Sequence, residues 1–198
     1  KFEFIDMGGG LGVPYKPEDK ELNLTLFSDK VLALFNRRID EYGLGKPFFC
    51  VEPGRYLVCD ASVLLTAVST VKTTPFKKFV GIDAGFNTLI RPTMYGSYHP
   101  VLVADKLGSA EEETYDVVGP ICESGDALAR DRRLPKIEEG DLLAVLNAGA
   151  YGFAMSSQYN ARPRPAEVLV KNGMYTLVRE RESIDVLLSG QRTAEWLQ

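Results

Sequence analysis

The 198-residue sequence is poor in the residues from which metal sites and disulfide frameworks are built. It holds one histidine and three cysteines, and no two of the cysteines form a CxxC pair. A zinc-type metal site cannot be assembled from so few ligands. An odd, sparse cysteine count is typical of proteins in a reducing compartment. We therefore expect no bound metal and a cytoplasmic location.

Long apolar runs and a basic stripe are missing as well. No run approaches the roughly 20 apolar residues that a membrane-spanning helix needs, so no membrane partner is expected. The formal net charge is -4, which argues against nucleic acid as a partner. Hydrophobic residues make up 45% of the chain, enough for a core. The length suits one large or two small domains.

The first third of the chain has the pattern of an α/β fold. Residues 2–6 and 48–51 read as short apolar strands, and residues 24–42 carry apolar side chains near helical spacing. Gly43 is a natural end for that helix. We expect a strand–helix–strand segment within residues 1–65.

From about residue 63 the pattern changes to short strands separated by turn residues. Asn172-Gly173 lies between two apolar runs and is the strongest hairpin signal in the chain. Residues 66–198 therefore predict an antiparallel β-barrel or sandwich, with the boundary near residues 61–72. The expected strands are 63–71, 79–82, 101–104, 114–118, 142–146, 167–170 and 174–178.

Two motifs follow the strands of the first segment directly. Gly8, Gly9 and Gly10, in the run GGGLG, could let backbone N–H groups approach a phosphate closely. Such loops lie at the phosphate-binding face of parallel barrels, although a simple turn has the same composition. In Glu52-Pro53-Gly54-Arg55, the carboxylate could bind a protonated ring nitrogen and the guanidinium an anion. The alternative is a surface ion pair at a Pro-Gly turn.

The later segment carries further candidates. Arg91 and Tyr95 are four residues apart and would share one face of a helical turn, although Pro92 interrupts a regular helix. In Cys122-Glu123 a thiol stands beside a carboxylate. The thiol could donate a proton, although a buried inert cysteine is the commoner case. Tyr151 lies between small residues. This pattern is typical of a helix start close to a ligand, and ordinary packing of an aromatic ring in the core is the alternative. The single histidine, His99, is expected to be structural, and Cys50 and Cys59 inert.

In this order, the motifs GGGLG, EPGR, IRPTMY, CESGD and GAYGFAMSSQYNARPRPAEVLV resemble those of the bacterial and archaeal diaminopimelate decarboxylases. These are pyridoxal-phosphate-dependent enzymes with an alanine-racemase-like fold, and the resemblance spans essentially the whole chain. It implies that residues 1–65 form the last strands and helices of a (β/α)8 barrel of TIM type. Residues 66–198 would be the C-terminal β domain, with residues for substrate and dimer contacts.

The resemblance also implies a cofactor, a substrate and a reaction. Pyridoxal 5'-phosphate would be bound by Gly8, Gly9, Gly10, Glu52, Pro53, Gly54, Arg55 and Tyr151. A carboxylate at Glu52 keeps the ring nitrogen protonated, so the ring withdraws electrons from the breaking C–C bond. The implied reaction converts meso-2,6-diaminopimelate to L-lysine and CO2, the last step of lysine biosynthesis.

Substrate contacts are implied for Arg55, Arg91, Tyr95, Glu123 and Tyr151, with Cys122 as the proton donor. Arg91 and Glu123 form a matched cation and anion for the far end of a diamino dicarboxylate. In the family, Cys122 and Glu123 reach into the partner subunit's site, which implies a homodimer.

One family feature has no counterpart in this sequence. Family members attach the cofactor through a lysine, and stack a histidine on it, at positions that precede the GGGLG motif. No lysine of the chain has that context, so we expect the chain to be part of an enzyme of about twice its length. Two alternatives stay open: a related decarboxylase of another amino acid, and a non-catalytic regulatory homologue.

Overall fold

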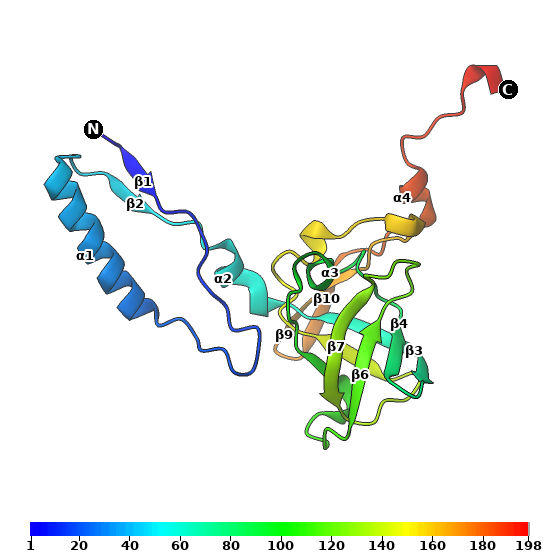
Figure 1. Ribbon diagram of the computed structural model, residues 1–198. Coiled ribbons are helices and arrows are strands. Elements are labelled where there is room, and N and C mark those ends of the chain that lie inside the picture. Colours follow the sequence, from blue (N-terminus) through cyan, green and yellow to red (C-terminus); the bar gives the residue numbers. More distant parts are fainter. Residues whose placement is uncertain (198) are drawn as a thin grey trace.

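The computed structural model of the protein describes residues 1–197, which form a small α/β unit and a larger β part (Figure 1). In the α/β unit, β1 (Phe4–Asp6) and β2 (Phe48–Cys50) pair in parallel and are joined by α1 (Leu24–Tyr42). The unit is a single strand–helix–strand crossover, as the sequence predicts. The described residues contain no closed barrel of parallel strands.

Helix α1 begins and ends at residues suited to those positions. The side chain of Asn23 accepts the N–H of Leu26 at 2.9 Å and caps the first turn. Gly43 takes the left-handed conformation (φ 58) that ends the helix. The Phe35 and Phe49 rings meet edge to face at 4.9 Å, which packs α1 against β2. The predicted range of this helix is confirmed.

The β part is built around one six-stranded sheet with the order β5-β8-β3-β4-β6-β7. Its edge strands β5 and β7 contact each other, so the sheet is nearly closed into a barrel. The strands are β3 (Leu64–Thr73), β4 (Lys78–Ile82), β5 (Val101–Val103), β6 (Glu113–Val118), β7 (Ala127–Leu134) and β8 (Leu142–Val145).

Two features of this sheet differ from the prediction. The sheet is mixed rather than antiparallel, because β4 and β6 pair in parallel with Val80 opposite Val117. In addition, β7 is not among the predicted strands. Its second half is rich in charged residues. Leu128 and Leu134, near its two ends, are buried. Of the charged side chains between them, Arg132 is half-buried with its guanidinium carbon 3.4 Å from the centre of the Tyr98 ring, and the others are exposed.

The core lies inside this curved sheet. Among its most deeply buried side chains are Val80, Val103, Tyr115, Val117, Leu128, Leu143 and Val145, which come from five of the six strands. Short helical segments connect or follow the strands: α2 (Gly54–Val58), α3 (Arg91–Tyr95) and five 3-10 turns at Cys59–Ala61, Ala104–Lys106, Phe153–Met155, Tyr159–Ala161 and Glu195–Leu197. The last of these turns lies away from the sheet (Figure 1). Helix α3 packs against β7.

The predicted hairpin is present as a separate two-stranded sheet of β9 (Glu167–Lys171) and β10 (Met174–Arg179). Asn172 and Gly173 both have positive φ, as a tight two-residue turn requires. Beyond it lies α4 (Ile184–Leu188). Among residues 1–197, no helix is long and apolar enough to cross a membrane.

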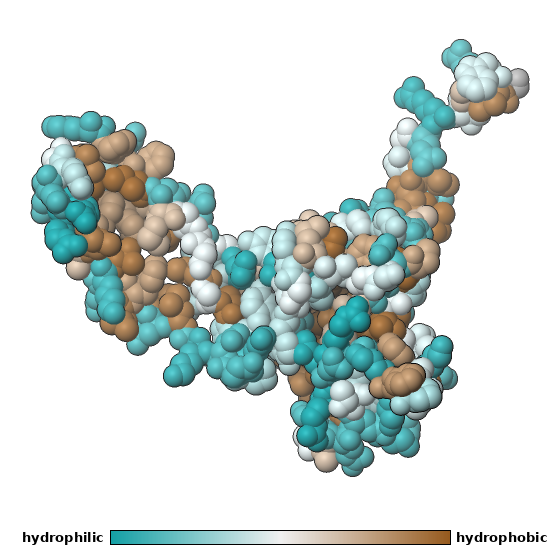
Figure 2. Space-filling view, viewed as in Figure 1, coloured by the Kyte–Doolittle hydropathy of each residue, from teal (hydrophilic) through white to brown (hydrophobic). Residues whose placement is uncertain are grey.

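Apolar side chains lie exposed over the α/β unit and over α4, where Figure 2 shows brown surface. On the α/β unit they include Leu24, Leu26, Leu32, Leu34 and Phe48. Contiguous apolar surface of this kind marks a contact face.

A buried carboxylate ties together the β4–β6–β7 corner of the sheet. Asp116 is 2% exposed. Its carboxylate forms an ion pair with the Lys77 ammonium at 2.8 Å and accepts a hydrogen bond from the Asp131 N–H at 2.7 Å. Burial alone would raise the pKa of Asp116, but the Lys77 ammonium and the Asp131 N–H outweigh it and hold that pKa below its usual value.

Replacing this carboxylate should destabilise the protein in a pH-dependent way. Asp116→Asn is expected to cost about 1–3 kcal/mol at pH 7, because the amide cannot accept from both donors. A depressed folded-state pKa gives stability that is present above the ordinary Asp pKa of about 3.9 and is lost as the pH falls through the folded value. Thermal unfolding from pH 7 to 3 should show wild type and variant converging in acid. Asp131→Asn, at a side chain that is 69% exposed, is the control; an undiminished gap at pH 3 would contradict the assignment.

Candidate functional site

The GGGLG and EPGR loops lie side by side because β1 and β2 are parallel and end at the same edge. The Glu52 N–H donates to the Gly8 carbonyl at 2.8 Å, and Gly8 and Gly10 have φ of 77 and 86. A methyl group on Gly9 would lie 2.5 Å from the Glu52 carbonyl oxygen. Only glycine at this position allows the two loops to approach this closely.

A cavity of about 230 Å³ opens between these loops. It is lined by Gly9, Gly10, Leu11, Glu52, Pro53, Arg55, Tyr56 and Tyr151. Most of the predicted cofactor residues are thus brought together from three distant parts of the sequence. Gly8 and Gly54 do not line the cavity, and the Gly8 N–H donates instead to the Asp6 carboxylate at 2.8 Å.

The turn that carries Tyr151 is pressed against the end of α2. The Gly149 N–H donates to the Cys59 carbonyl at 3.0 Å, and a methyl group on Gly149 would overlap the Val58 carbonyl oxygen. Tyr151 has a positive φ of 61, and its ring lies 5.7 Å from the Arg55 guanidinium carbon. The expected helix start is only a 3-10 turn, at Phe153–Met155.

Arg91 and Tyr95 share the single turn of α3, as their spacing predicts. Pro92 is tolerated because it stands in the first turn, where its missing N–H has no helical partner to lose. The Arg91 side chain is 6% exposed, and its guanidinium carbon lies 5.6 Å from the Tyr95 ring and 5.1 Å from the Tyr151 ring. Tyr151 therefore joins Arg91 to the cavity.

The Arg91 charge is buried without a carboxylate. Its Nη2 donates to Ser97 Oγ at 3.2 Å, its Nε has no hydrogen-bond partner, and no ion pair to Arg91 forms among residues 1–197. A buried cation without a counter-ion is costly. The arrangement is suited to binding an anionic ligand.

Sequence reasoning missed Tyr15, a third ring beside Arg91 at 5.7 Å. The Cys59 thiol donates to the Tyr15 hydroxyl at 3.2 Å, and the His99 ring meets Tyr15 edge to face at 5.4 Å. The only signal of Tyr15 in the sequence was that it is an aromatic residue soon after the GGGLG run. His99 is structural, as expected: its Nδ1–H donates to the Leu146 carbonyl at 2.9 Å, and burial lowers its pKa.

Cys122 and Glu123 lie on the loop between β6 and β7, apart from the cavity residues. The Asn160 amide donates to Cys122 Sγ at 3.2 Å, and Glu123 accepts the Gly125 N–H at 3.4 Å. Within the part of the chain that the structure describes, neither side chain forms a hydrogen bond or ion pair with a cavity residue. Cys122 is exposed, so its thiol is free to meet another molecule.

The loop that carries Cys122 is nevertheless well held. Asp126 is buried and accepts the N–H groups of Phe86 and Ile121, each at 2.7 Å. Burial raises the pKa of Asp126, against the effect of these two donors. Thr93 of α3 donates its hydroxyl to the Gly125 carbonyl at 2.7 Å, which links the loop to the turn that carries Arg91.

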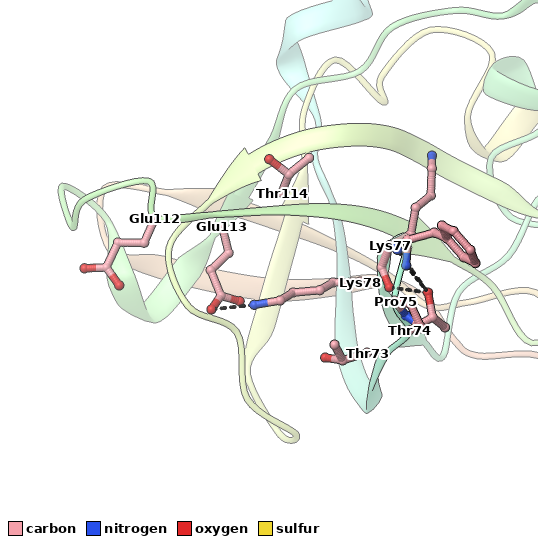
Figure 3. Close-up of a pocket in the computed structure, with 9 residues that line it drawn as sticks. Thr73, Thr74, Pro75, Lys77, Lys78, Glu112, Glu113 and Thr114 are labelled. Carbon is pink, nitrogen blue, oxygen red and sulfur yellow. Dashed lines mark hydrogen bonds and ion pairs between the residues drawn. The ribbon is translucent and has the colours of Figure 1, made fainter.

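A second, more open hollow of about 440 Å³ lies near the β3–β4 turn (Figure 3). Its lysines are already paired, Lys78 with Glu113 at 2.7 Å and Lys77 with Asp116 at 2.8 Å. It contains none of the motif residues. Among residues 1–197, no group of three or more His, Cys, Asp or Glu side chains could hold a metal ion.

Comparison with known proteins gives a consistent result. Residues 24–149 match the family model described as pyridoxal-dependent decarboxylase, C-terminal sheet domain. The chain is 60% identical to the diaminopimelate decarboxylase of Methanothermobacter thermautotrophicus over 96% of its own length and 44% of that protein. It is 53% identical to that of Archaeoglobus fulgidus, over 100% of the chain and 46% of the relative.

A solved structure of diaminopimelate decarboxylase from M. jannaschii in complex with L-lysine is also similar. It superposes with a TM-score of 0.89 at 37% identity, covering 99% of this chain and 44% of the other. The chain thus spans somewhat less than half the length of the relatives it matches. The family model covers more than half of the chain, so this protein belongs to the pyridoxal-dependent decarboxylases and carries their C-terminal sheet domain.

Proposed function

We propose that the chain is the C-terminal part of a longer enzyme that converts meso-2,6-diaminopimelate to L-lysine and CO2, using pyridoxal 5'-phosphate. The high identity to diaminopimelate decarboxylases supports this reaction. The observation that carries it is Arg91, a buried guanidinium that lacks an anion and reaches the cavity through Tyr151. A carboxylate at the far end of the substrate is the group that such a cation selects.

The residues around the cavity suit a phosphorylated ring. Gly9 and Gly10 lie where a side chain is excluded or strained, so backbone can approach a phosphate closely, and Arg55 adds a positive charge. Glu52 supplies the carboxylate that keeps a pyridine nitrogen protonated, and Tyr151 lines the same space. When bound, pyridoxal phosphate supplies an electron sink for the carbon from which CO2 departs.

The other residues hold the substrate and move a proton. Arg91 and Tyr95 bind the distal carboxylate, and Glu123 binds the distal ammonium. Cys122 returns a proton to the reacting carbon through its thiol. Since neither Cys122 nor Glu123 forms a hydrogen bond or ion pair with a described cavity residue of its own chain, we assign them to the cavity of the partner subunit in a homodimer.

The remaining architecture follows from this assignment. The β1–α1–β2 unit, with its exposed apolar side chains, is the last part of a (β/α)8 barrel whose other strands lie outside this chain, as does the lysine that holds the cofactor. The relatives are more than twice as long as the matched segment, which leaves room for such a barrel. We place the enzyme in the cytoplasm.

A substrate comparison tests the reaction. The full-length protein, loaded with pyridoxal phosphate, is expected to release CO2 from meso-diaminopimelate at least about a hundredfold faster, in kcat/KM, than from lysine or ornithine, because these leave Arg91 unpaired. CO2 release and lysine formation are measured together. Equal rates with ornithine would favour the related decarboxylase, and no CO2 from any amino acid would favour the regulatory homologue.

A further inference from the structure

We propose that Tyr15 is a positioning residue for Arg91: its ring forms one wall of an aromatic cage that holds the guanidinium ready for a carboxylate. The inference rests on the proposed function and adds a residue to its substrate site. Tyr15 follows Gly10, a cavity residue, by five residues, so one loop contributes both to the cavity and to the Arg91 cage.

The cage consists of three phenol rings around one cation. The Arg91 guanidinium carbon lies 5.7 Å from the Tyr15 ring, 5.6 Å from Tyr95 and 5.1 Å from Tyr151. These ring faces replace the carboxylate that a buried arginine normally needs. They are weaker than an ion pair, so a ligand carboxylate gains the full charge–charge interaction when it enters.

Tyr15 is itself fixed from two sides. The Cys59 thiol donates to its hydroxyl at 3.2 Å, and the His99 ring packs against it at 5.4 Å. The preceding backbone is held too, since the Asn147 amide donates to the Pro14 carbonyl at 3.4 Å. A ring held in this way restricts the guanidinium beside it.

Tyr15 also stays neutral. Burial, and then the contact with Cys59, raise the pKa of Tyr15 to about 12. A phenolate beside Arg91 would form an ion pair and occupy the charge that the substrate needs. A neutral ring supports the cation without competing for it.

The test uses the full-length, cofactor-loaded enzyme and two variants of Tyr15. Tyr15→Leu is expected to raise KM for meso-diaminopimelate by about tenfold with kcat little changed, because loss of a cation–π wall weakens the site for the carboxylate. The Kd of pimelate, a dicarboxylate without amines, should rise by a similar factor in calorimetry. Tyr15→Phe keeps the ring and should stay within about threefold of wild type in both measurements.

The control variant is Tyr42→Leu, which removes an exposed ring that lies 6.0 Å from the Arg38 guanidinium carbon on α1 and should change neither value. If Tyr15→Leu does not fold, Tyr15→Met provides the same comparison. Unchanged KM and Kd in an active Tyr15→Leu enzyme would overturn the inference, as would an equal loss in Tyr15→Phe. A wild-type enzyme that releases no CO2 would instead overturn the proposed function.

Discussion

Dimers assembled from two inactive variants, Arg91→Gln and Cys122→Ala, should recover about half of the wild-type activity. Each variant alone is expected to lose roughly a hundredfold or more in kcat/KM, because one lacks the cation proposed to bind the substrate and the other lacks the proposed proton donor. In a mixed dimer with shared sites, both substitutions fall in one site and the other site is intact. The two chains are co-expressed with different affinity tags, and the doubly tagged dimer is assayed.

A second mixed dimer distinguishes sites shared between subunits from a general stabilisation of one variant chain by the other. Arg91→Gln and Glu52→Gln alter residues on the same side of the proposed interface, since Tyr151 contacts Arg91 and lines the cavity with Glu52. Their mixed dimer therefore has one defect in each site and should stay inactive. No recovery in the Arg91→Gln and Cys122→Ala dimer would mean that each subunit holds a complete site. Recovery in the control dimer would mean that Arg91 and Glu52 of one chain serve different sites.

Gly149→Ala should be among the most destabilising single substitutions in the chain, with a loss of roughly 4 kcal/mol or more. The new methyl group would overlap the Val58 carbonyl oxygen, and backbone cannot move aside as a side chain can. The movement would also break the bond from the Gly149 N–H to the Cys59 carbonyl. Thermal unfolding of the full-length protein measures the effect.

Gly12→Ala is the matched control, because a methyl group there meets no atom within 4 Å. Its melting temperature should lie close to that of wild type, while Gly149→Ala melts lower by about 4 °C or more, since the full-length protein is more than twice as long as this chain. Similar melting temperatures for the two variants would show that the Tyr151 turn can relax at little cost.

Much of the fold could be predicted because its signals are local. The helix at Leu24–Tyr42 has periodic apolar residues and an αL glycine at its end, and the β9–β10 hairpin has its Asn172-Gly173 turn. The parallel pairing of β4 with β6 has no local signal, since it joins strands that are separated by β5. β7 was missed because its charged half masks the alternation expected of a strand.

The candidate site was predictable to the extent that its residues stand in motifs. Glu52, Arg55 and Tyr151 were identified and share one cavity. Tyr15 was not, because a single aromatic residue in a loop has no pattern, and its role depends on contacts with Arg91 and Cys59 that only the folded chain creates. For the same reason, sequence could not show that Gly8 faces Asp6 rather than the cavity.

The anchored Cys122 loop affects the thermodynamics of subunit association. Asp126 and Thr93 hold this loop through groups of its own chain. A loop that is ordered before two subunits meet has little backbone freedom left to lose on docking. The proposed dimer should therefore form at a smaller entropic cost than one in which a mobile loop must first become ordered at the interface.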